Sequence, residues 1–187
     1  FDLTLRQQPK QSRMCGIGEK ADRRPIDPPP IIQLRVSDIS MKLDKTVSPM
    51  CSNFVSLLDR TFLYNPYYFM YASLMLADSD DEMHLLQDGK TRSTTGSLVS
   101  SLYHLKDEDN SDGGFFVFPD LSVRMEGKYR LKFTLFEIVG MEVFYCSSIC
   151  SDTFTVYSAK RFPGMEESTP LSRSFADQGL KIRIRKE

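Results

Sequence analysis

Basic side chains gathered near the start of the chain are the residues best suited to chemistry with a ligand. Six basic residues face three acidic ones over residues 1–24, so this segment carries a net charge of +3. Glycine lets a backbone approach a ligand closely, and arginine offers a planar fork of donors that fits phosphates and the edge of guanine. The pattern fits a DNA-binding loop and, equally well, a solvated loop with ion pairs to Glu19 and Asp22. The basic residues are Arg6, Lys10, Arg13, Lys20, Arg23 and Arg24.

A second basic cluster lies at the other end of the sequence. Residues 181–187 also net +3, whereas residues 78–112 net −6, so the overall charge of −1 conceals a polarised surface. The pattern predicts additional phosphate contacts if both clusters lie at the same end of the fold. The alternative is the solvent-facing side of an edge strand. The members of this cluster are Lys181, Arg183, Arg185 and Lys186.

Cys15 lies within the first basic cluster, where nearby positive charge favours a reactive thiolate. One hypothesis is therefore redox-sensitive DNA binding. The alternative is a small residue packed beneath the loop. The four cysteines are scattered, and Cys146 and Cys150 lack a second ligand pair at zinc spacing, so we expect reduced, largely buried thiols and no metal.

Catalytic motifs are missing from the sequence. It contains no P-loop, no dinucleotide-binding glycine pattern and no nucleophile elbow. His84 and His104 lie beside polar stretches, which predicts solvent-exposed loop histidines rather than catalytic bases. We expect no enzymatic activity, no cofactor and no small-molecule substrate. No apolar run approaches the roughly 20 residues of a membrane helix, which predicts an intracellular protein without a membrane partner.

Strands must position these residues, because period-two alternation dominates the chain. In the clearest strand, residues 128–136, alternate positions place Tyr129, Leu131 and Phe133 on one face. Many short strands with few helices predict an all-β fold, arranged as a β sandwich in a single domain over residues 1–187. The other expected strands are residues 1–6, 31–36, 115–118, 143–145, 153–157 and 180–185.

Between the strands we expect two short helices, at residues 52–63 and at residues 172–178 before Gly179. Residues 78–96 and 106–114 are predicted to be solvated, mobile loops. The proline-rich residues 25–30 predict a polyproline II spacer that carries the basic loop to the next strand.

An unusually aromatic stretch lies at the start of residues 65–76, which we expect to form a strand. Aromatic side chains favour the cores of protein interfaces, so this stretch supports a protein-interaction module that reaches DNA only through a partner. The alternative is that every second residue belongs to the sandwich core. The residues concerned are Tyr64, Tyr67, Tyr68, Phe69 and Tyr71.

Several long motifs, in order, cover nearly the whole chain and resemble the velvet domain of fungal developmental regulators, especially those that act in spore viability. The first part carries RQQP at residues 6–9, RMCG at 13–16, EKADRRPIDPPP at 19–30 and NPYYFMYA at 65–72. The second part carries FPDLSVR at 118–124, EGKYRL at 126–131, YSAKRFPGM at 157–165 and FADQGLKIR at 175–183.

The resemblance implies an immunoglobulin-like β sandwich similar to the Rel/NF-κB DNA-binding domain. It also implies sequence-specific binding to double-stranded promoter DNA and nuclear transcription regulation of development, sporulation and spore maturation. The implied protein partner is a second velvet protein, either VelB-like or another copy of the chain. Rel domains read DNA with arginines before Cys-Glu-Gly, so the resemblance assigns this role to Arg13 and Cys15, although Gly16 stands where that glutamate would be.

Overall fold

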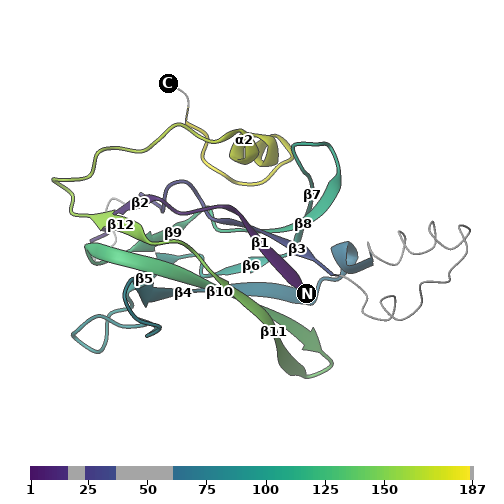
Figure 1. Ribbon diagram of the computed structural model, residues 1–187, viewed down its shortest axis with the longest axis horizontal. Helices are drawn as coiled ribbons and strands as arrows, with labels where there is room; N and C mark the ends of the chain where they lie inside the picture. Colours follow the sequence, from purple (N-terminus) through teal and green to yellow (C-terminus); the bar gives the residue numbers. More distant parts are fainter. Residues whose placement is uncertain (17–23, 37–60, 186–187) are drawn as a thin grey trace, which may run out of the picture.

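The computed structural model describes residues 1–16, 24–36 and 61–185 (Figure 1). Twelve strands, one 3-10 helix and one α-helix are described over these residues. In the first part these are β1 (Asp2–Gln7), β2 (Gln11–Arg13), β3 (Ile31–Arg35), η3 (Thr61–Tyr64), β4 (Tyr68–Leu76), β5 (Thr94–Gly96) and β6 (Val99–Ser101). In the second part they are β7 (Tyr103–Lys106), β8 (Asp112–Val117), β9 (Leu121–Val123), β10 (Gly127–Val139), β11 (Glu142–Cys150), β12 (Phe154–Tyr157) and α2 (Pro170–Asp177).

Two sheets face each other and confirm the predicted all-β sandwich. The first sheet has the order β1-β3-β8-β7, and the second has the order β2-β12-β10-β4-β6 with β11 also on β10. A small ribbon of β5 and β9 lies beside them. The similarity to Rel domains stays a prediction.

Strand β10 is the spine of the larger sheet. It pairs with β4 along one edge, and its other edge is shared by β12 near its start and β11 near its end. The predicted alternation is confirmed, because Tyr129, Leu131 and Phe133 are buried between the sheets. Burial of each such side chain contributes about 1.5–3 kcal/mol to folding. Ser151 bridges the gap between β11 and β12, since its N–H donates to Leu131 O at 2.7 Å and its hydroxyl accepts the Leu131 N–H at 2.9 Å.

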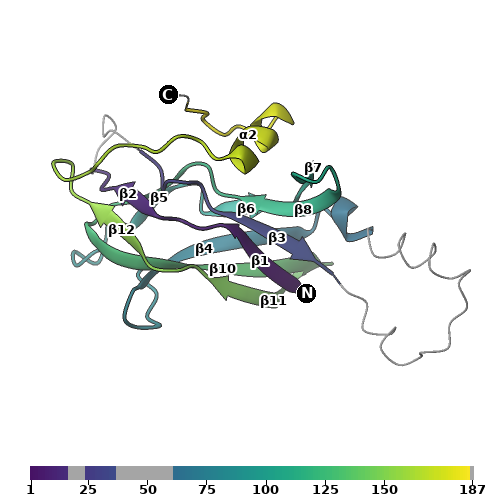
Figure 2. The same ribbon diagram turned by 45° about the horizontal axis from the view of Figure 1, so that its top comes forward.

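A third layer covers the outer face of the four-stranded sheet, where α2 lies over β3 and β8 (Figure 2). Phe175 of α2 packs on Phe115 of β8, with ring centroids 4.7 Å apart. The helix is capped by Thr169, whose hydroxyl accepts the Ser172 N–H, and Gly179 leaves it at a φ of +100°. The predicted helix is therefore confirmed and begins at Pro170.

The predicted strand at residues 180–185 is wrong, because these residues pair with no strand. The chain returns along α2 instead, and the Arg185 N–H donates to Ser168 Oγ at 2.9 Å. Ile182 is buried against the cluster that contains Phe175. Ile182 and Ile184 therefore pack against the helix. An extended segment that packs in this way has the same alternation of apolar residues as an amphipathic strand.

Other predictions for the connecting segments need correction. Gly113 and Gly114 belong to β8 rather than to a loop, and a Cβ on Gly113 would lie 2.7 Å from the Phe115 ring. Residues 25–30 are not a free spacer, because Ile26 and Asp27 are buried, Asp27 bridges to Gln11, and the bond before Pro28 is cis.

Two more expectations concern residues 52–63 and 78–96. Residues 52–60 lie outside the described residues, and the part of the predicted helix that follows them forms η3. Residues 78–96 are partly ordered against the sheet, since Ser93 and Thr94 are buried and β5 begins there. Over the described ranges, no helix is long and apolar enough to cross a membrane.

Candidate nucleic-acid interface

Strand β2 lies at one end of the sandwich and carries Arg13 of the first basic cluster (Figure 1). It runs parallel to β12, with Arg13 opposite Tyr157. The Met14 N–H donates to Tyr157 O at 2.7 Å and continues the pairing past the strand end. Arg13 is therefore held by an ordered ladder.

Cys15 follows Arg13 by two positions and is buried, with 2% of its surface exposed. Its N–H donates to Val123 O at 2.9 Å, which joins the basic loop to β9. Burial favours the packing interpretation of this thiol over the redox hypothesis. The expectation of largely buried thiols is wrong for Cys150, which is exposed, whereas Cys146 is half-buried and Cys51 lies outside the described residues.

Arg124 follows β9 and was not among the predicted site residues. Its Nη1 donates to Gly16 O at 2.8 Å, so it holds the backbone just after Cys15. A basic residue immediately after the FPDLSV stretch is the only signal that the sequence offers for it.

Arg24 reaches the same end of the molecule from the other side of the basic loop. Its guanidinium carbon lies 6.0 Å from the centroid of the Phe162 ring, which is cation–π geometry. Phe162 follows a turn in which the Arg161 N–H donates to Ser158 O at 3.1 Å. Lys160 and Arg161 are exposed on this turn, directly after β12. These two residues were missed as site residues, although they stand inside the YSAKRFPGM motif.

The basic end is defined here as Arg13, Arg24, Arg124, Lys160 and Arg161. Two adjacent strands and the segments that leave them bring these residues to one end of the sandwich. Clustered arginines and lysines suit contacts to phosphates and to base edges. Lys10 lies before β2, where its Nζ is 3.3 Å from Glu166 Oε2 in an exposed ion pair.

Arg6 lies elsewhere, near the end of β1, and already has an acidic partner. Its Nη2 donates to Asp107 Oδ1 at 2.9 Å, and its Nη1 donates to Gln33 Oε1 at 3.0 Å. The hydrogen bond from Arg6 lowers the pKa of Asp107, and the same bond raises the pKa of Arg6. The structure thus accounts for Arg6 without a ligand.

The residues of the second basic cluster lie in different environments in the structure. Arg185 Nη1 donates to buried Asp27 Oδ1 at 3.3 Å, so its charge serves the fold. Burial is the main cause that raises the pKa of Asp27. Lys181 and Arg183 are exposed on the segment that follows α2. The remaining predicted residues Lys20, Arg23 and Lys186 lie outside the described residues.

The residues of the aromatic stretch also differ in their exposure. Tyr68 is buried in the core, as the alternative prediction required, and burial raises its pKa to about 12. Phe69 and Tyr71 are half-buried on the opposite face of β4, whereas Tyr64 and Tyr67 are exposed. The partner-interface prediction therefore has support from exposure only at the latter two.

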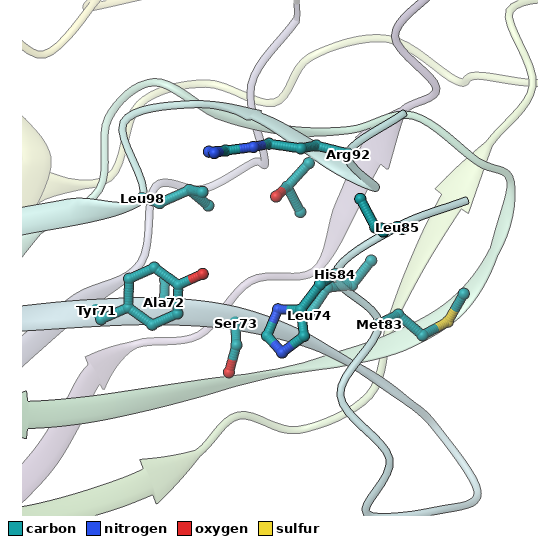
Figure 3. A pocket seen from close by; sticks show the side chains of 10 residues that line it. Tyr71, Ala72, Ser73, Leu74, Met83, His84, Leu85, Arg92 and Leu98 are labelled. Carbon is teal, nitrogen blue, oxygen red and sulfur yellow. The ribbon is translucent and has the colours of Figure 1, made fainter. Parts of the chain in front are cut away.

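A hollow of about 500 Å³ lies between β4 and the segment after it (Figure 3). Figure 3 shows the Arg92 side chain across one side of the hollow and the His84 ring on the other. His84 Nε2 is 3.4 Å from Glu82 Oε2, and His104, which lies in β7 rather than in a loop, is 3.0 Å from Asp112 Oδ1. Both rings thus face surface carboxylates. The absence of enzymatic activity stays a prediction.

The chain is an all-β sandwich domain with a helix-covered face and one basic end, and comparison with known proteins gives its family. The family model described as velvet factor matches residues 1–94 and 85–187. The chain therefore belongs to the velvet family.

Its relatives are named as regulators of development. The spore development regulator umv1 of Mycosarcoma maydis is 54% identical over 218 residues, which cover all of this chain and 27% of the relative. The spore development regulator RYP2 of Ajellomyces capsulatus is 47% identical over all of this chain and 43% of the relative. The spore development regulator VOSA of Pyricularia oryzae is 43% identical over all of this chain and 33% of the relative. The chain thus spans less than half the length of these relatives.

Proposed function

We propose that this velvet domain binds double-stranded promoter DNA through its basic end and regulates transcription during fungal development and spore formation. The observation that carries the proposal is the convergence of Arg13, Arg24, Arg124, Lys160 and Arg161 on one end of the sandwich. Arg6 and Arg185 are left out, because each is engaged by a carboxylate that the fold buries or half-buries.

Transcription regulation, nuclear location and association with a second velvet domain belong to the same proposal. The names of the relatives support the developmental role. A Chaetomium globosum relative, 46% identical with 100% of this chain and 38% of the relative covered, is named as a component of the velvet complex. That name supports assembly with another velvet protein, either VelB-like or identical to this chain.

Electrostatics predicts how the binding responds to salt. Each neutralised phosphate releases condensed counterions, so four to six contacts give a slope of about −4 to −5 for log affinity against log salt. Ordered arginines on a rigid edge would add base contacts, which phosphate attraction alone does not supply.

The test is a fluorescence-anisotropy titration of the purified chain with duplexes selected from random DNA, at several salt concentrations. Lys160→Ala/Arg161→Ala should weaken binding and make the salt slope shallower by about 2. Arg35→Ala/Lys106→Ala is the matched control, because it removes the same two charges from exposed positions in β3 and β7 of the other sheet. Equal loss in both variants, or no loss in either, would contradict the assignment.

A second candidate function is an interaction module that reaches DNA only through a partner. The exposed aromatic side chains of Tyr64 and Tyr67 favour it, because such residues anchor protein interfaces. The same titration separates the two functions: saturable, salt-sensitive binding by the single chain rules out the second.

A further inference from the structure

The turn that joins β10 to β11 projects from the end of the sandwich opposite β2 and β12 (Figures 1 and 2). Its apolar residues are exposed, with relative accessible surfaces between 38% and 102%. The apolar turn is defined as Ile138, Val139, Met141, Val143, Phe144 and Tyr145.

The apolar turn is large for a surface that faces only water. At about 150–200 Å² for a fully exposed large residue, its members present roughly 600 Å². The largest apolar patch on a typical monomer is about 300–600 Å², and such patches commonly mark interaction sites. A standard interface takes about 800 Å² from each partner, so the apolar turn and a strand edge together reach the required size.

The patch continues onto the outer face of the sheet. Phe136 stands opposite Tyr145 and Phe69 in the strand register, and its ring stacks on Phe69 with centroids 5.4 Å apart. Tyr145 meets Phe136 edge to face at 6.4 Å. The ladder of β10 and β11 thus holds the aromatic side chains in place before any partner binds, which reduces the entropy lost on association.

Strand β11 is also an edge strand of the larger sheet, although β1 of the other sheet lies close to it. Among the described residues, β10 is the one strand that pairs with it. Residues 143–151 include no charged residue and no proline. Natural edge strands commonly carry lysine, proline or inward-facing charge, which blocks pairing with another chain. Within β11 these features are missing from residues 143–150, and Glu142 at the start of the strand is its one charged residue.

We infer that the apolar turn and the β11 edge form the surface through which a second copy of this chain binds. The inference rests on the proposed association with a second velvet domain and names its surface. Two identical antiparallel strands can pair about a two-fold axis, which makes the contact self-complementary and closed. Because the run is uncharged, identical strands meet without repulsion, whereas a charged partner would find no complementary charge.

This geometry separates self-association from DNA binding. Strand β10 has 13 residues and runs from the basic end to the apolar turn, a length of about 40 Å. Antiparallel pairing of two β11 edges turns the two basic ends away from each other. A monomeric variant should therefore keep its affinity for a short duplex.

Sedimentation equilibrium of the 187-residue chain tests the inference without DNA. The wild type should form dimers. Val143→Glu and Tyr145→Glu should each raise the dimer dissociation constant by about 100-fold or more, because each buries two unpaired carboxylates in the contact. Leu85→Glu is the control, since it places the same charge on an apolar residue that is 46% exposed in another segment.

Two further measurements show whether a variant affects only association, and not folding or DNA binding. Thermal unfolding of each variant should remain cooperative, and its anisotropy titration with a short duplex should match the wild type. In the wild type itself, hydrogen exchange of the β11 amides should slow as protein concentration rises, and this needs no variant.

Three outcomes would overturn the inference. The first is a wild type that stays monomeric at about 100 μM, a concentration far above a micromolar dissociation constant. The second is a dimer that Val143→Glu leaves intact. The third is a chain that binds only a different velvet domain through β11. If instead dimers form as expected but no duplex binds, the surface stands and the proposed DNA function fails.

Discussion

Arg185 and Asp27 are separated by 158 positions in the sequence, yet Arg185 Nη1 lies 3.3 Å from Asp27 Oδ1. The same buried carboxylate accepts the Glu166 N–H at 2.6 Å. The Asp27 main chain exchanges two hydrogen bonds with Gln11, at 2.8 and 3.0 Å. Asp27 therefore joins the segment after α2 to β2, the strand that carries Arg13.

Loss of the Arg185 guanidinium should destabilise the fold, because it leaves Asp27 buried without its charged partner. Arg185→Met is expected to lower the free energy of unfolding by about 1–3 kcal/mol. Urea unfolding followed by circular dichroism measures the change. The control Arg183→Met, at an exposed side chain on the same segment, should change it by less than about 0.5 kcal/mol. Equal effects of both variants would refute the structural role.

The pair of Arg6 and Asp107 should make stability depend on acidic pH. Asp107 has a pKa below its usual value in the folded chain, chiefly because Arg6 donates to it. Its contribution is therefore present above the unfolded pKa of about 4 and is lost as the pH falls through the lower folded value. Arg6→Met should cost about 1 kcal/mol at pH 7 and less at pH 3, by denaturant unfolding. A cost that stays constant with pH would show that the charge pair is not the cause.

The same Arg6→Met variant should bind DNA like the wild type, since Arg6 lies outside the basic end.

Gly96 should not tolerate a side chain. Its φ is +92°, and a Cβ built there would lie 1.7 Å from Asp120 O, on the chain just before β9. Gly96→Ala should therefore cost more than about 2 kcal/mol, because strain and a backbone clash add together. Gly89→Ala is the control, as Gly89 has a φ of +64° and open space around it, and should cost about 1 kcal/mol. Thermal or urea unfolding compares the two, and similar costs would contradict the close approach at Gly96.

Cysteine reactivity should follow exposure. Under native conditions iodoacetamide should label Cys150 first, Cys146 more slowly and Cys15 last. Burial raises the pKa of the Cys146 thiol and so reduces its reactive thiolate. Peptide mass mapping at successive times gives the order. Early labelling of Cys15 would restore the redox hypothesis for the basic loop.

Most strands of the core could be predicted because each carries its own pattern, whereas the short β9 was not predicted. Residues 128–136 alternate so regularly that Leu131 and Phe133 could be assigned to the interior from the sequence. Residues 180–185 alternate as well, but periodicity does not reveal the neighbour. Ile182 packs under α2 rather than beside a strand, and this depends on the chain reversal at Gly179.

The candidate site was harder to predict, because charge in a sequence does not show where partners lie. Arg6 belongs to the same basic cluster in the sequence as Arg13, but nothing near Arg6 in the sequence reveals its pairing with Asp107, which lies 101 positions later. Lys160 and Arg161 join the site only because β12 runs beside β2. That parallel pairing links distant segments and has no local signature.

The buried hydroxyl of Ser151 has a consequence for how the larger sheet unfolds. It accepts a hydrogen bond from the Leu131 N–H of β10, between the part of β10 that pairs with β11 and the part that pairs with β12. Opening that starts at the exposed turn can therefore proceed along β11 and stop at Ser151, while β12 and β2 stay paired. The sheet would then contain two cooperative units on one strand, and native-state hydrogen exchange would find the β11 amides opening at lower free energy than those of β12.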